Sequence, residues 1–131
     1  ISAFGEHVIS KEVETAIEEV CKGTPVQVKE FTVAPQITPN NGLPHHEWFI
    51  EFGTYPKKIK EFADKLDKKM QEKNIYYRDL IIGKVLCPLI ITEVAPSAFR
   101  NYMKSIGKLG GQNKIPRLSN DRKIVDQLSL K

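Results

Sequence analysis

The chain has 131 residues, of which 40% are hydrophobic and 27% charged, a composition typical of one soluble globular domain with a core of its own. It contains no apolar run long enough to predict a membrane span, and a net charge of +4 is too small by itself to indicate nucleic-acid binding. We therefore expect a single domain over residues 1–131 with neither a membrane nor a nucleic acid as partner.

One helix and a hairpin are predicted in order from the first part of the chain. Residues 10–22 predict a helix, because apolar side chains recur at helical spacing before a glycine and a proline. Residues 26–33 predict a strand whose alternation changes phase, which indicates a bulge near Lys29 and Glu30. Residues 46–52 predict a second strand that pairs with the first as an antiparallel hairpin. One face of this second strand carries large apolar side chains: Trp48, Ile50 and Phe52.

The second half predicts further helices and one more strand. Residues 57–73 carry an apolar stripe of amphipathic helical spacing, and residues 76–85 predict a shorter helix. Residues 89–94 form a compact apolar run that is typical of a buried strand. A helix then begins after a proline and a serine and ends at Gly107, and Ser119 can cap a last helix.

This order of elements predicts the α+β class. We expect a small, mostly antiparallel sheet of about three strands, covered on one side by helices.

The cysteines and histidines do not form a metal or redox pattern. Cys21 and Cys87 lie far apart among apolar neighbours, so we expect buried free thiols and a cytoplasmic protein. His45 and His46 would point to opposite faces of a strand and cannot easily share one ion. The sequence therefore predicts no metal site.

The strongest chemical candidate is the basic, glycine-containing segment of residues 107–122. Gly110 and Gly111 permit a turn whose N–H groups are open to an anion, and a following proline stiffens the chain. The segment would therefore present Lys114 and Arg117 to a phosphate or a carboxylate. Three alternatives stay open: a plain connecting loop, a stand-alone module that binds an anion or RNA, and an interaction domain whose apolar hairpin edge docks a partner.

Residues 104–122 resemble the C-terminal signature of the auxin-responsive Gretchen Hagen family of acyl-acid amido synthetases, particularly its bacterial branch. The likeness continues in the same order through residues 4–6, 46–52 and 74–79. Plant members carry Tyr and Thr at the two positions that flank the motif lysine, where this chain has Asn113 and Ile115.

The resemblance implies the C-terminal lid domain of a two-domain enzyme of the adenylate-forming superfamily. Such an enzyme uses ATP with Mg²⁺ as a substrate to activate a carboxylic acid. It then transfers the acyl group to the amine of an amino acid. The partner would be the N-terminal adenylating domain of the same polypeptide. The isolated C-terminal domain is expected to be inactive and to hold no cofactor.

The resemblance also implies roles for individual residues. The motif lysine, which matches Lys114, would be catalytic and would reach the adenylating site on a mobile loop. Arg117 would hold the loop or contact phosphate. Lys108, Gly110 and Gly111 would complete an ATP- or phosphate-binding loop.

Overall fold

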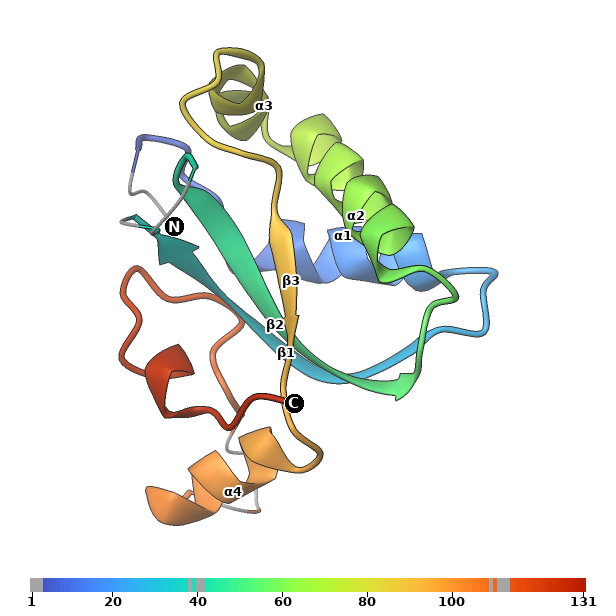
Figure 1. Ribbon diagram of the computed structural model, residues 1–131, viewed down its shortest axis with the longest axis vertical. Helices are drawn as coiled ribbons and strands as arrows, with labels where there is room; N and C mark the ends of the chain where they lie inside the picture. The colour runs from blue at the N-terminus through green and yellow to red at the C-terminus, as the bar shows by residue number, and fades with distance from the viewer. Residues whose placement is uncertain (1–3, 38, 40–41, 109, 111–113) are drawn as a thin grey trace.

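The computed structural model describes residues 4–37, 39, 42–108, 110 and 114–131 (Figure 1). The elements follow the order α1 (Ser10–Cys21), β1 (Gln27–Gln36), β2 (His45–Thr54), α2 (Ile59–Lys73), α3 (Ile75–Ile82), β3 (Ile90–Glu93) and α4 (Ala98–Ser105), with a short 3-10 helix at Val125–Gln127. The predicted α+β fold with three strands is confirmed.

The sheet has the strand order β1-β2-β3 and is mixed. β1 and β2 pair antiparallel, as predicted, whereas β3 lies parallel to β2. The two intervening helices, α2 and α3, return the chain before β3 begins, and such a crossover connection yields a parallel neighbour. β3 is also less buried than predicted, because it is a short edge strand and the side chain of Ile90 is 46% exposed.

The predicted bulge in β1 is confirmed. Val28 pairs with Phe52 and Glu30 pairs with Glu51, so Lys29 is the extra residue on the β1 side of the ladder. A bulge of this kind bends the strand locally and redirects the neighbouring side chains.

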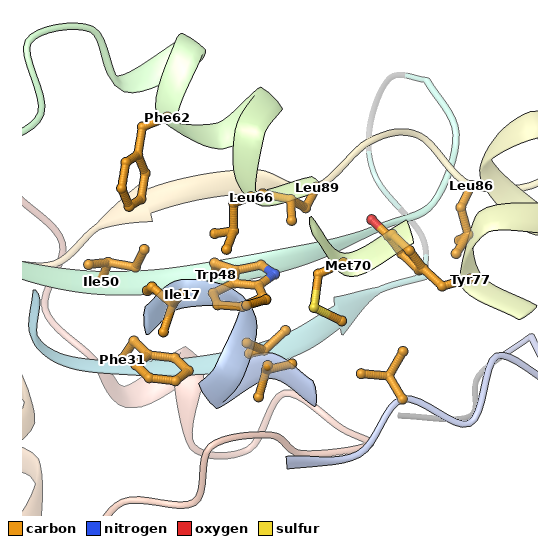
Figure 2. Close-up of a cluster of buried hydrophobic side chains, with 14 of the residues drawn as sticks. Ile17, Phe31, Trp48, Ile50, Phe62, Leu66, Met70, Tyr77, Leu86 and Leu89 are labelled. Atoms are coloured by element: carbon orange, nitrogen blue, oxygen red, sulfur yellow. The ribbon is translucent and has the colours of Figure 1, made fainter. Parts of the chain in front are cut away.

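One face of the sheet packs against α1, α2 and α3. Figure 2 shows Trp48 of β2 at the centre of this first core, with side chains from β1, α1 and α2 around it. The ring of Phe31 stacks on Trp48 with 5.5 Å between the ring centroids. The apolar stripe predicted for α2 supplies its buried residues Phe62, Leu66 and Met70.

The other face of the sheet is covered as well, which corrects the prediction of one covered face. Side chains alternate along a strand, and Ala34 and Phe49 therefore point away from the first core into a second one. Phe99 of α4 and the later residues Ile115 and Val125 close this second core. In Figure 1, α4 and the orange-to-red C-terminal segment lie apart from α1 and α2.

The helix predicted after Ser119 does not form. The N–H of Val33 donates to the carbonyl of Arg117 at 2.9 Å, and the N–H of Ser119 donates to the carbonyl of Val33 at 3.0 Å. Residues 117–119 are thus extended beside β1, where they satisfy the outward-facing N–H and carbonyl of Val33. Only the single 3-10 turn follows, and it is sufficient to bring Val125 and Leu128 into the second core.

Within the described part of the chain, every helix is too short or too polar to cross a membrane.

Candidate functional site

The basic loop begins where α4 ends. Gly107 follows the helix with a φ of +72°, a conformation that glycine adopts at little cost, and Gly110 has a φ of +89°. The chain is described again from Lys114 onward, and the predicted site residue Gly111 lies outside the described residues. Ile115 is only 3% exposed and packs into the second core, so it anchors the exposed Lys114 beside it.

Lys114, Lys108 and Gly110 line one hollow of about 260 Å³, so the structure brings these three predicted site residues together. Two further cations line the same hollow from elements outside the loop. They are Lys29 of the β1 bulge and Arg100 of α4. Phe99, which is buried, forms part of the wall.

The charge of this cationic hollow is strongly unbalanced. Of its two acidic residues, Glu30 forms an ion pair with Arg117, whereas Glu51 keeps its negative charge and accepts a hydrogen bond from the neutral N–H of Ser97 at 3.2 Å. Among the described residues, none forms an ion pair with the side chains of the four cations: Lys29, Arg100, Lys108 and Lys114. An arrangement of this kind favours binding of an anion.

Arg117 lines a second hollow, which shares Lys29 and Glu30 with the first one. Its guanidinium pairs with Glu30, lies 3.7 Å from Glu14 and donates to the carbonyl of Phe31 at 3.1 Å. It also lies 4.6 Å from the centroid of the Phe31 ring, in a cation–π contact. These contacts fix the loop against β1, whereas a contact of Arg117 with phosphate stays a prediction.

The backbone beside Arg117 strengthens this attachment. The hydroxyl of Thr32 donates to the carbonyl of Pro116 at 2.6 Å, and the ladder to Val33 follows directly. The loop is therefore held firmly on the C-terminal side of Lys114.

Asp121 and Arg122, next to the loop, form structural contacts. Asp121 accepts a hydrogen bond from the N–H of Lys123 at 3.0 Å, which closes a turn. Arg122 forms an ion pair with Glu47 at 3.0 Å and lies over the ring of Phe49.

A buried polar network was missed by sequence reasoning. Glu6 is fully buried, and Nε2 of His46 donates to its carboxylate at 2.6 Å. Burial alone would raise the pKa of Glu6, but hydrogen bonds from His46 and from backbone N–H groups outweigh it and hold the pKa below its ordinary value. The nearby hydroxyl of Tyr77 donates to the buried carboxylate of Asp67, and burial followed by that negative charge raises the pKa of Tyr77 well above 10.0.

The network accounts for the burial of His46, one of the two adjacent histidines considered for a metal site. No group of three metal-ligating side chains occurs within the described ranges. Cys21 and Cys87 are free thiols, as predicted, but both are half-buried and not fully buried. Burial raises the pKa of the Cys21 thiol, which disfavours the reactive thiolate.

The sequence model described as the GH3 family C-terminal domain matches residues 11–123. The chain belongs to the GH3 family. The matched range contains the bulge, α4 and all the lining residues of the cationic hollow, so this GH3 domain carries the hollow within its family region. A comparison with curated protein sequences finds no match.

Two solved structures share the fold of this GH3 domain. A GH3.15 acyl acid amido synthetase matches with a TM-score of 0.64 and 20% sequence identity, over 90% of this chain and 21% of that one. AtGH3.15 acyl acid amido synthetase in complex with 2,4-DB matches with a TM-score of 0.66 and 17% identity, over 90% of this chain and 22% of that one. The GH3 domain thus spans about a fifth of the length of these enzymes.

Proposed function

We propose that this GH3 domain is the C-terminal lid of an ATP-dependent acyl acid amido synthetase of the bacterial type. The enzyme would adenylate a small carboxylic acid with Mg-ATP and then pass the acyl group to an amino acid amine. An N-terminal adenylating domain would hold most of the nucleotide and the acid. The family match and the shared fold of two acyl acid amido synthetases support the proposal.

Lys114 would act in the first half-reaction. A carboxylate oxygen of the acid forms a bond to the α-phosphorus of ATP, and the bond from that phosphorus to the bridging oxygen breaks. The electron pair leaves with pyrophosphate, so negative charge grows on the transferred and departing phosphates. An ammonium group held at this point stabilises that charge. The observation that carries the assignment is the place of Lys114, which is exposed on the cationic hollow with no ion-pair partner among the described residues.

The remaining loop residues would serve the same phosphates. Lys108 would add a second ammonium, and the turn at Gly110 and Gly111 would supply backbone N–H groups and let the loop move. A phosphate contact by Arg117 would require it to leave Glu30, so we assign Arg117 first to holding the loop on β1.

A second candidate function is a stand-alone module that binds an anion or RNA, and the unpaired cations of the hollow favour it. The dependence of RNA binding on salt concentration distinguishes the two candidate functions. Binding of RNA through lysines and arginines weakens steeply as salt rises, whereas a lid domain is expected to have little affinity for RNA at any salt concentration.

The test of the proposed function is ATP–pyrophosphate exchange by the full enzyme over a panel of carboxylic acids. We expect exchange with at least one acid and a fall of about a hundredfold in Lys114→Ala, the scale of losing one preorganised charge contact. Lys104→Ala is the matched control, because Lys104 is an exposed lysine of α4 that does not line the hollow. Absence of exchange with every acid, together with salt-sensitive RNA binding, would favour the second candidate.

A further inference from the structure

We infer that Lys29 and Arg100, which lie outside the glycine-lysine loop, bind the pyrophosphate part of ATP in the cationic hollow and retain it as the leaving group. The inference rests on the proposed function and extends it to a composite site. β1 supplies one contact, α4 supplies another, and the loop supplies Lys108 and Lys114.

The bulge in β1 is what places Lys29 at this hollow. Lys29 has no partner in the β1–β2 register, and its side chain belongs to neither hydrophobic core. Its stem lies against Gly53 of β2, where a Cβ atom would be 3.4 Å from Cγ of Lys29, an ordinary van der Waals contact. Lys29 therefore lies beside the neighbouring strand at Gly53.

Arg100 is placed by the packing of α4. The preceding residue, Phe99, is buried in the second core, and this anchors the first turn of the helix against the sheet. Arg100 is exposed next to it and reaches the same hollow as Lys114. Its guanidinium has the planar fork of donors that suits two phosphate oxygens at once.

The charge and the size of the hollow fit a polyphosphate better than a whole nucleotide. Four cations face two carboxylates in this hollow, and one of those, Glu30, is paired with Arg117, so a positive excess remains after the charge of Glu51 is counted. An anion with several charges matches this excess better than a single carboxylate does. The volume of about 260 Å³ lies near the lower end of the range for small-molecule sites, which suits a compact anion. The adenosine and the acid would then bind outside this hollow.

The test measures binding of inorganic pyrophosphate to the full enzyme by titration calorimetry. We expect Kd to rise about fivefold or more in each of Lys29→Ala and Arg100→Ala, because each variant loses a charge-assisted contact at a partly solvated site. Arg100→Lys keeps the positive charge and should recover part of the affinity. The matched controls are Lys104→Ala and Arg78→Ala, which replace exposed cations outside the hollow.

A second measurement separates binding from folding and from Lys114. In ATP–pyrophosphate exchange, both variants should raise the KM for pyrophosphate and leave the KM for the acid unchanged, and a purely structural defect would not divide the two constants in this way. The inference would be overturned if Kd were unchanged in both variants or rose equally in the control variants. It would also be overturned if the wild type did not bind pyrophosphate. The proposed function is tested apart from this, by the effect of Lys114→Ala on exchange.

Discussion

The buried pair of Glu6 and His46 should contribute strongly to the stability of the domain. Glu6→Gln keeps the shape of the side chain but removes the charge that accepts hydrogen bonds from His46 at 2.6 Å and from the N–H of Phe4 at 2.8 Å. Glu6 and His46 are 0% and 2% exposed, so water does not replace the lost interaction. Breaking a buried pair of this kind costs about 3 kcal/mol, which corresponds to a fall in Tm of about 10 °C for a chain of this size.

Urea unfolding measures this loss, and the fluorescence of the buried Trp48 is a suitable probe. The matched control is Glu61→Gln, because the carboxylate of Glu61 is 67% exposed and lies 3.7 Å from Lys58 in a surface ion pair. That substitution should change the free energy of unfolding by no more than about 0.5 kcal/mol. Equal losses in the two variants would refute the claim that burial gives the Glu6–His46 pair its strength.

The pH dependence of the same pair has a definite sign. The pKa of Glu6 is lower in the folded protein than its ordinary value of 4.5. The folded state therefore binds this proton less tightly than the unfolded state, so the contribution of Glu6 is complete above about pH 4.5 and is lost as the pH falls through the folded pKa. The difference in stability between wild type and Glu6→Gln should shrink over that acidic window, and a difference that grows on acidification would contradict the assignment.

Two further substitutions test the packing around the site. Tyr77→Phe removes the hydroxyl that donates to Asp67, and it should lower the free energy of unfolding by about 2 kcal/mol in the same urea assay. Among the described residues, the buried Asp67 carboxylate would then keep only its hydrogen bonds from Leu89 and Gln71. Arg117→Ala removes the ion pairs and the ring contact that hold the loop and should cost about 1–2 kcal/mol, whereas Lys114→Ala should cost less than about 0.5 kcal/mol. A Lys114→Ala variant as unstable as Arg117→Ala would show that Lys114 has a structural role.

Local patterns in the sequence were sufficient to predict most of the elements. The alternation of Trp48, Ile50 and Phe52 predicted β2 and its core-facing side, and the phase change near Lys29 predicted the bulge. These features depend on residues within a few positions of one another, and their periods are fixed by backbone geometry.

Features that depend on distant contacts were not predictable in the same way. The helix expected after Ser119 is replaced by turns and a 3-10 helix at Val125–Gln127, whose Val125 packs into the distant second core. The residues just before it, Arg117 and Ser119, pair with Val33 on the free edge of β1. The Glu6–His46 pair joins residues that are 40 positions apart, and no local spacing marks it.

The candidate site likewise combines residues that are local in the sequence with residues that only the fold brings together. Lys108, Gly110 and Lys114 lie in one segment and were predicted together, whereas Lys29 and Arg100 reach the hollow only through the fold. Arg117 was predicted from the same segment, but the direction of its side chain depends on Glu30 of the distant bulge. Sequence reasoning therefore found the loop and missed the surface that it faces.

The most direct test of the central claim measures the two half-reactions separately in Lys114→Ala. The full enzyme is assayed for ATP–pyrophosphate exchange, and then for amide formation from a supplied acyl adenylate and an amino acid. If Lys114 stabilises the phosphates during adenylation, exchange should fall about a hundredfold while amide formation from the adenylate stays within about threefold of wild type. Unchanged exchange with a loss of amide formation would contradict the account and would assign Lys114 to the second half-reaction.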